Sequence, residues 1–99
     1  MAAPPPNQPA WFVYLVRCHD DTLYCGIATD LARRLAEHNS ADKGAKYTRG
    51  RRPVQLIYTE EVSSRSVAMQ REGQIKKMSK TRKNTLIDSI TNQLRTNQA

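Results

Sequence analysis

The sequence WFVYLV at residues 11–16, followed by TLYCG at residues 22–26, decides the fold of this chain. The first segment is aromatic, β-branched and aliphatic throughout, which is typical of a strand buried on both faces or nearly so. The intervening His19, Asp20 and Asp21 supply turn-forming side chains. The two segments therefore predict a β-hairpin.

The rest of the chain predicts three helices and one further strand. The first helix is capped by Thr29 or Asp30 and ends near Asn39, and a polar loop follows over 39–52. The further strand covers 54–62. The second helix is capped by Ser63 or Ser64 and reaches about Met78, and the third runs from Ser79 to about Leu94. The order ββαβαα favours an α+β fold with a small three-stranded antiparallel sheet flanked by helices.

The length of 99 residues allows one domain, which we place at residues 11–94. Residues 1–10 hold four of the five prolines and no charged side chain, so we expect a disordered leader, and we expect 95–99 to form a flexible tail.

The longest apolar run is far shorter than the roughly 18 residues of a membrane span. No secretory signal is apparent, and two cysteines are too few for a disulfide scaffold. We therefore expect a soluble cytoplasmic protein.

Sixteen Lys and Arg residues against nine Asp and Glu give a net charge of +7. The basic side chains gather in two groups, Lys43, Lys46, Arg49, Arg51 and Arg52, and Lys76, Lys77, Lys80, Arg82 and Lys83. A solvated charged surface would account for both groups. The interleaved Tyr47 and Thr48, however, suit base stacking and phosphate contact. We therefore expect a nucleic-acid partner and no membrane partner.

Two predicted helices carry a charged side chain beside an apolar stripe. Arg34 and His38 share a face with Leu31 and Leu35, at spacings i, i+3, i+4 and i+7. A charge there favours an anionic partner, although Arg34 at the rim of the core and His38 at the helix end would also satisfy the spacing.

Glu72 is also a charged residue on an apolar helix face, here with a negative charge, because it shares that face with Ala68 and Ile75. It could pair with Lys76 at i+4, or it could be a metal ligand. Tyr14 and Tyr24 lie on adjacent strands, either directly opposite or offset, where tyrosines are usually core residues. We expect the two tyrosines, Arg34, His38 and Glu72 to point toward a common core face.

These residues resemble the GIY-YIG nucleases, specifically their small stand-alone bacterial members. The two signatures are Phe12-Val13-Tyr14 and Tyr24-Cys25-Gly26, and the segment 24–39 is similar to the family's passage into its catalytic helix. Glu72 lies in a segment like the helix that bears the family's metal-binding glutamate. Asn84 matches an asparagine of the related excision-repair nuclease domain. The resemblance covers residues 11–84.

Three positions depart from the family pattern. Phe12 replaces the glycine of the first signature, and Cys25 replaces the isoleucine of the second. Both are apolar strand positions, so the fold should survive. Ile27 stands where several relatives have Lys, Ser or Thr, which removes one potential phosphate contact.

The resemblance implies a metal-dependent DNA endonuclease, linked to DNA repair or processing, and favours DNA over RNA as the substrate. Glu72 would bind a single Mg²⁺ or Mn²⁺, and Arg34 would contact the scissile phosphate. Tyr14 or His38 would accept the proton of the attacking water, and Tyr24 would position water or phosphate. The residues expected to bind nucleic acid are Lys43, Lys46, Tyr47, Thr48, Arg49, Arg51, Arg52, Lys76, Lys77, Lys80 and Asn84.

Two other functions fit the same sequence. One is a nucleic-acid-binding module that keeps the GIY-YIG fold and cleaves little or not at all. The other is a protein-interaction adapter that uses the basic surface.

Overall fold

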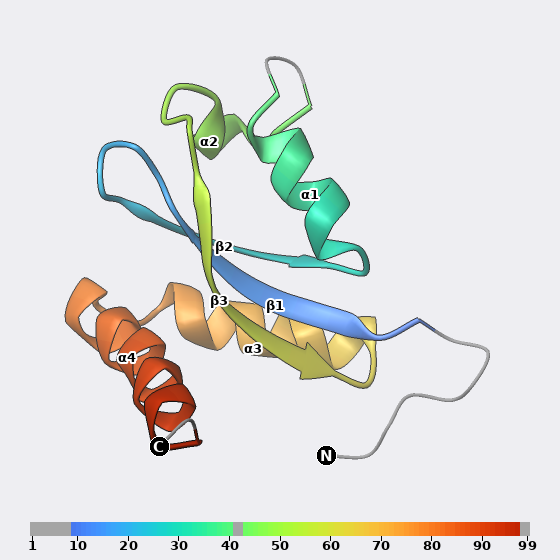
Figure 1. Cartoon of the computed structure of the whole chain (residues 1–99). Coiled ribbons are helices and arrows are strands. Elements are labelled where there is room, and N and C mark those ends of the chain that lie inside the picture. The colour runs from blue at the N-terminus through green and yellow to red at the C-terminus, as the bar shows by residue number, and fades with distance from the viewer. Residues whose placement is uncertain (1–8, 41–42, 98–99) are drawn as a thin grey trace.

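A computed structural model describes residues 9–40 and 43–97 of the chain, with side chains described as far as residue 89. Strands β1 (Trp11–Arg17), β2 (Leu23–Ala28) and β3 (Gln55–Val62) form an antiparallel sheet in the order β2-β1-β3 (Figure 1). The α+β class and the three-stranded antiparallel sheet predicted from the sequence are confirmed.

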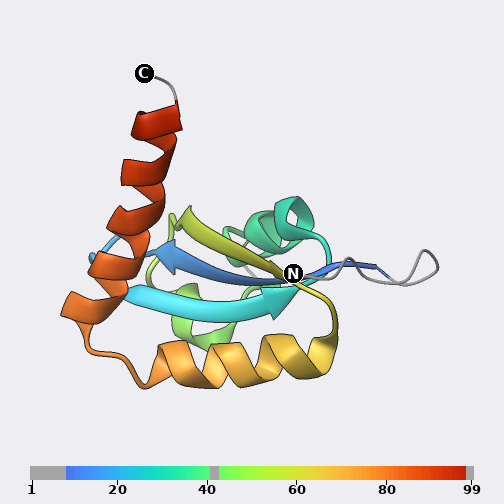
Figure 2. The ribbon, with the colours of Figure 1, turned by 90° about the horizontal axis from the view of Figure 1, so that it is seen from below.

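The helices are α1 (Leu31–His38), α2 (Lys46–Arg49), α3 (Arg65–Lys76) and α4 (Lys80–Asn97). The order ββαβαα fits, with one addition: the stretch expected to be a polar loop contains the single turn α2. Helix α3 lies along one face of the sheet, and α4 projects away from it (Figure 2).

Strand β1 lies in the centre of the sheet and is covered on both faces. Val13 and Leu15 point toward the core beneath α3 and α4, whereas Tyr14 and Val16 point toward the core beneath α1. All four side chains are buried. The sheet thus separates two small apolar cores, which explains why this strand has a continuous apolar sequence.

Local side-chain chemistry sets the helix starts. Asp30 accepts a hydrogen bond from the Arg33 amide (3.0 Å), and Ser64 accepts one from the Val67 amide (3.2 Å). Between the two caps considered for each helix, the structure therefore selects Asp30 and Ser64. Such caps satisfy amides that have no partner within the helix.

The hairpin turn fixes how the two tyrosines lie. The Cys18 amide donates to the Thr22 carbonyl (2.8 Å), which makes the connection longer than a two-residue turn. In the resulting register Tyr14 is opposite Gly26, and Tyr24 is opposite Val16. The tyrosines are therefore offset neighbours on one face, which is the second of the two arrangements considered.

The ends of the chain fall partly outside the described residues. Residues 1–8 of the expected leader and residues 98–99 of the expected tail lie there, whereas α4 continues through Asn97, beyond its expected end at Leu94. Within the described part of the chain, no helix has the length and apolar character needed to cross a membrane.

The glycine of the second signature is required by the ring of Tyr14. A Cβ atom added at Gly26 would lie 2.5 Å from the Tyr14 hydroxyl oxygen and 2.7 Å from Cζ. We expect Gly26→Ala to lower the free energy of unfolding by about 1–3 kcal/mol, because the ring must move within a packed core. Urea denaturation measures this change.

Gly73→Ala is the matched control, because a Cβ atom at Gly73 in α3 meets nothing within 4 Å. It should raise stability by roughly 0.5–1 kcal/mol, since alanine is the better helix former. Equal stability of Gly26→Ala and the wild type would show that the Tyr14 ring is not confined as described.

Candidate active site

Three buried side chains from three elements form a hydrogen-bonded chain. The Tyr14 hydroxyl lies 2.7 Å from His38 Nε2, and His38 Nδ1 lies 2.9 Å from Thr48 Oγ1. Tyr14 comes from β1, His38 from the end of α1 and Thr48 from α2. Their exposed fractions are 2%, 0% and 0%. The helical spacing therefore places His38 in the core beside Tyr14, and the short α2 supplies its other partner.

The direction of this chain follows from the single proton of the Thr48 hydroxyl. Thr48 donates it to the Ala45 carbonyl (3.0 Å), so Oγ1 accepts from His38 Nδ1. Nε2 of a neutral His38 then carries the lone pair and accepts from Tyr14. Burial, with the charge of Arg34, lowers the pKa of His38 and favours this neutral form.

Arg34 gives this buried chain a positive neighbour. Burial raises the pKa of Tyr14 to about 12, and interaction with the Arg34 guanidinium opposes part of that rise. Arg34 Nη1 donates to Glu37 Oε1 (3.1 Å) and to the Lys43 carbonyl (3.4 Å). Arg34 therefore favours negative charge on the Tyr14 oxygen. Its side chain is held by Glu37 of its own helix and by the Lys43 carbonyl in the following loop.

Tyr24 connects His38 to the surface through stacked groups. Its ring lies edge-on to the His38 ring, with centroids 5.3 Å apart, and is stacked on Tyr47 at 5.7 Å. The guanidinium carbon of Arg51 lies 4.1 Å from the Tyr47 ring centroid. Tyr47 is 37% exposed, so this stack leads from the buried imidazole to solvent.

The residues expected to bind nucleic acid differ in accessibility. Thr48 differs from the rest of the set, because its side chain is fully buried and hydrogen-bonded to His38. Arg51 is bound to Asp20 (3.0 Å), and Lys80 to the Asp21 carbonyl (2.9 Å). Lys43, Lys46, Arg49, Arg52, Lys76 and Lys77 are exposed, and Asn84 is half-buried near the start of α4.

Glu72 lies on the opposite side of the sheet from the other candidate catalytic residues. It belongs to α3, its side chain is 22% exposed, and its carboxylate is 3.6 Å from Lys76 Nζ. Burial is the main cause that raises the pKa of Cys25 on β2, and the negative charge of Glu72 raises it further. Glu72 is therefore close to this edge strand. The expectation of one common core face therefore does not hold for Glu72.

An ion pair that the sequence does not reveal joins α3 to β3. Arg71 binds Glu60 of β3 with two nitrogen atoms, Nε to Oε1 at 2.8 Å and Nη2 to Oε2 at 2.9 Å. Tyr58 also donates to Glu60. Burial raises the pKa of Glu60, but the Arg71 and Tyr58 hydrogen bonds hold it below its ordinary value. Since successive helical residues are about 100° apart, Glu72 points in a different direction from Arg71.

Among the described residues, no three His, Cys, Asp or Glu side chains come together as a metal site. A divalent ion at Glu72 would therefore take one protein carboxylate, with water and substrate oxygens completing its shell. Mg²⁺ is commonly bound in this way, so the partly exposed Glu72 fits such an ion.

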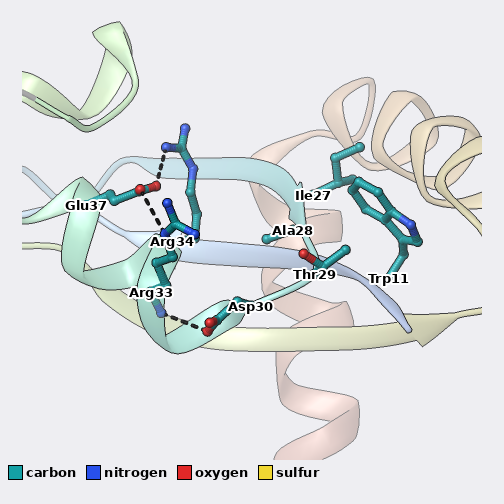
Figure 3. Close-up of a pocket in the computed structure, with 8 residues that line it drawn as sticks. All are labelled: Trp11, Ile27, Ala28, Thr29, Asp30, Arg33, Arg34 and Glu37. Carbon is teal, nitrogen blue, oxygen red and sulfur yellow. Dashed lines mark hydrogen bonds and ion pairs between the residues drawn. The ribbon is translucent and has the colours of Figure 1, made fainter. Parts of the chain in front are cut away.

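An open pocket of about 320 Å³ lies where β2 passes into α1. Trp11 and Ile27 form one end of it, and Arg33, Arg34 and Glu37 form the other (Figure 3). Arg34 therefore lies beside the hydrogen-bonded chain of Tyr14, His38 and Thr48 and also lines a space that a ligand can enter.

The signature of the GIY-YIG catalytic domain matches residues 10–85. The chain therefore belongs to the GIY-YIG family, and so to a superfamily of nucleases that act on nucleic acid and generally use divalent metal ions.

Its relatives within that family are UPF0213 proteins of similar length. The chain is 58% identical over 84 residues to one from Desulfotalea psychrophila, covering 85% of this chain and 76% of the relative. It is 53% identical over 80 residues to one from Natronomonas pharaonis, covering 81% and 93%. The resemblance to small GIY-YIG proteins is thus confirmed.

Two solution NMR structures have the same fold. A protein from E. faecalis matches with a TM-score of 0.58 and 36% identity, covering 86% of this chain and 90% of that one. A UPF0213 protein from Bacillus halodurans matches with a TM-score of 0.52 and 39% identity, covering 80% and 83%.

The buried, neutral His38 makes stability depend on pH. Its pKa in the folded state is below its ordinary value of 6.5, so below about pH 6.5 the unfolded chain binds the proton more readily. We expect the free energy of unfolding to fall as pH decreases from 7 toward 5, by at most about 1.4 kcal/mol per pH unit. Urea denaturation at each pH measures it.

His38→Gln should remove most of this slope, whereas His19→Gln, which changes an exposed histidine, should keep it. The lowered carboxyl pKa values of Glu37 and Glu60 act only at more acidic pH. The same pH slope in the wild type and in His38→Gln would contradict a buried neutral imidazole.

Proposed function

We propose that this protein is a metal-dependent endonuclease that hydrolyses phosphodiester bonds in DNA, acting in the cytoplasm in DNA repair or processing. The observation that carries the proposal is the pair of hydrogen bonds that link Tyr14 to His38 and His38 to Thr48, with Arg34 beside them. A neutral imidazole that accepts from a phenol, next to a fixed cation, is an arrangement for moving a proton near an anionic substrate.

The arrangement supports Tyr14 as the group that meets the attacking water. Nε2 of His38 is occupied by the Tyr14 hydroxyl, so His38 acts on water only through Tyr14. As the Tyr14 oxygen takes a proton from water, its own proton passes to Nε2. The resulting hydroxide attacks phosphorus, the bond from phosphorus to the leaving sugar oxygen breaks, and that oxygen takes a proton from solvent water. A tyrosine whose pKa is about 12 needs this acceptor to serve as a base near neutral pH.

Arg34 and Tyr24 would act on the phosphate. Negative charge increases on the non-bridging oxygens during attack, and the planar Arg34 guanidinium is suited to it. Binding phosphate would require Arg34 to exchange its 3.1 Å contact with Glu37. Tyr24, fixed between His38 and Tyr47, would position the water or the phosphate.

Glu72 would hold the metal ion, Mg²⁺ or Mn²⁺. When bound, such an ion supplies a Lewis acid for the phosphate oxygens. The carboxylate is free to do so once it leaves Lys76, because an i,i+4 pair with a half-exposed lysine is weak.

The second candidate function is a nucleic-acid-binding module with little or no cleavage. The observation that favours it is the position of Glu72 on the other side of the sheet from Tyr14 and Arg34, in contact with Lys76. Under this alternative the basic residues bind the backbone, and no divalent ion is needed.

Cleavage assays distinguish the two functions. Purified protein is incubated with supercoiled, branched and single-stranded DNA, with Mg²⁺, Mn²⁺ or chelator. We expect metal-dependent cleavage that falls about 10²- to 10⁴-fold in Tyr14→Phe, Arg34→Ala and Glu72→Gln, because each removes a proton-transfer or charge-stabilising group.

Glu61→Gln is the matched control for Glu72→Gln, since Glu61 is an exposed carboxylate on β3. Its cleavage rate should equal that of the wild type. Unchanged cleavage by Glu72→Gln and Arg34→Ala would remove the proposed site, and binding without cleavage of any DNA would favour the second candidate function.

DNA affinity should fall steeply with salt, because lysines and arginines that contact phosphates release counterions. Lys46→Ala and Arg49→Ala, both on α2, should each lower the slope of log affinity against log salt by about 1. Fluorescence anisotropy with labelled DNA measures this. Arg65→Ala, at the start of α3, is the control and should leave the slope unchanged. Salt-independent binding would contradict both candidate functions.

A further inference from the structure

The pocket beside Arg34 has an aromatic end that the proposed reaction does not use. Trp11, the single tryptophan of the chain, lines it together with Ile27 (Figure 3). Both side chains are half-buried and pack against the core under α3 and α4. One part of each side chain therefore belongs to the core, and another part borders open space.

The other end of the same pocket is charged and internally balanced. Arg34 and Arg33 both contact Glu37, at 3.1 Å and 3.5 Å, and Asp30 accepts from the Arg33 amide. Neither carboxylate is therefore an isolated negative charge facing a ligand. The Arg34 guanidinium, which can donate to a phosphate, and the apolar side chains of Trp11 and Ile27 thus border one pocket of about 320 Å³.

A nucleotide has this same division into parts. Its phosphate is anionic, and its base is a flat ring whose faces stack on aromatic side chains. A base inside a duplex has both faces covered by neighbouring bases, whereas an unpaired base has a face free to stack. The floor of the pocket between its two ends consists of Ala28 and Thr29, which are small enough to leave room for the sugar (Figure 3).

We propose that this pocket binds an unpaired base next to the phosphate held by Arg34, with the base against Trp11 and Ile27. This inference rests on the proposed function, because Arg34 is the phosphate ligand there. It makes nucleotides in single-stranded or frayed DNA the substrate class of the site. It also gives Trp11 a role besides its packing at the start of β1.

The intrinsic fluorescence of Trp11 tests this in the unaltered full chain, with chelator present to prevent cleavage. The probes are a short single-stranded oligodeoxynucleotide and an abasic backbone of equal length and charge. We expect the oligonucleotide with bases to quench Trp11 saturably, and to bind roughly tenfold more tightly than the abasic one. No quenching, or equal quenching by the two probes, would overturn the proposal.

Variants separate stacking from packing. Trp11→Leu should weaken binding of the oligonucleotide with bases roughly tenfold and leave abasic binding unchanged, whereas Trp11→Phe should recover much of the loss. Phe12→Leu is the matched control, because Phe12 is the adjacent half-buried aromatic residue on β1 and does not line the pocket. Equal losses in Trp11→Leu and Phe12→Leu would indicate packing alone and overturn the proposal.

Cleavage of the same two probes with Mg²⁺ or Mn²⁺ distinguishes the inference from the proposed function. Base-dependent quenching without cleavage supports the base site while favouring the binding module. Cleavage without base-dependent quenching overturns the base site and leaves the nuclease proposal intact.

Discussion

The Tyr14 hydroxyl has to fit between the backbone of Gly26 and the imidazole of His38, and much of the remaining architecture serves this contact. The hairpin register places a residue without a side chain opposite Tyr14. Helix α1 is capped at Asp30 and ends with His38 facing that oxygen, and α2 brings Thr48 to the far nitrogen. An isolated polar group would be costly in this core, so the three side chains satisfy one another.

The central sheet divides the candidate chemistry between its two faces. The groups able to move a proton, Tyr14 and His38, lie beneath α1, whereas the carboxylate able to hold a metal, Glu72, is on α3 across the sheet. Each of the three strands contributes side chains to both faces. The Arg71–Glu60 ion pair joins α3 to β3 on the face that carries Glu72.

Local features of the fold follow from the sequence because they depend on neighbours in the chain. The apolar continuity of β1 is of this kind, and so are the helix caps, which the sequence narrows to two adjacent residues each and the structure places at Asp30 and Ser64. The partnerships of Thr48 with His38 and of Arg71 with Glu60 join separate elements, so spacing within one helix does not reveal them. Thr48 illustrates the consequence: its basic neighbours suggest a surface role, but a single helical turn points it inward.

The net charge of the protein overstates how many of its basic side chains are unpaired and available to bind a polyanion. Arg51 is bound to Asp20, Lys80 to Asp21 and Lys76 to Glu72. These pairs are solvent-exposed on at least one side, and such pairs typically contribute about 0–1 kcal/mol. A phosphate, which accepts charge-assisted hydrogen bonds from the same groups, competes with partners this weak. The acidic residues therefore hold the basic side chains in place, and under the proposed function a nucleic-acid backbone would replace those acidic partners.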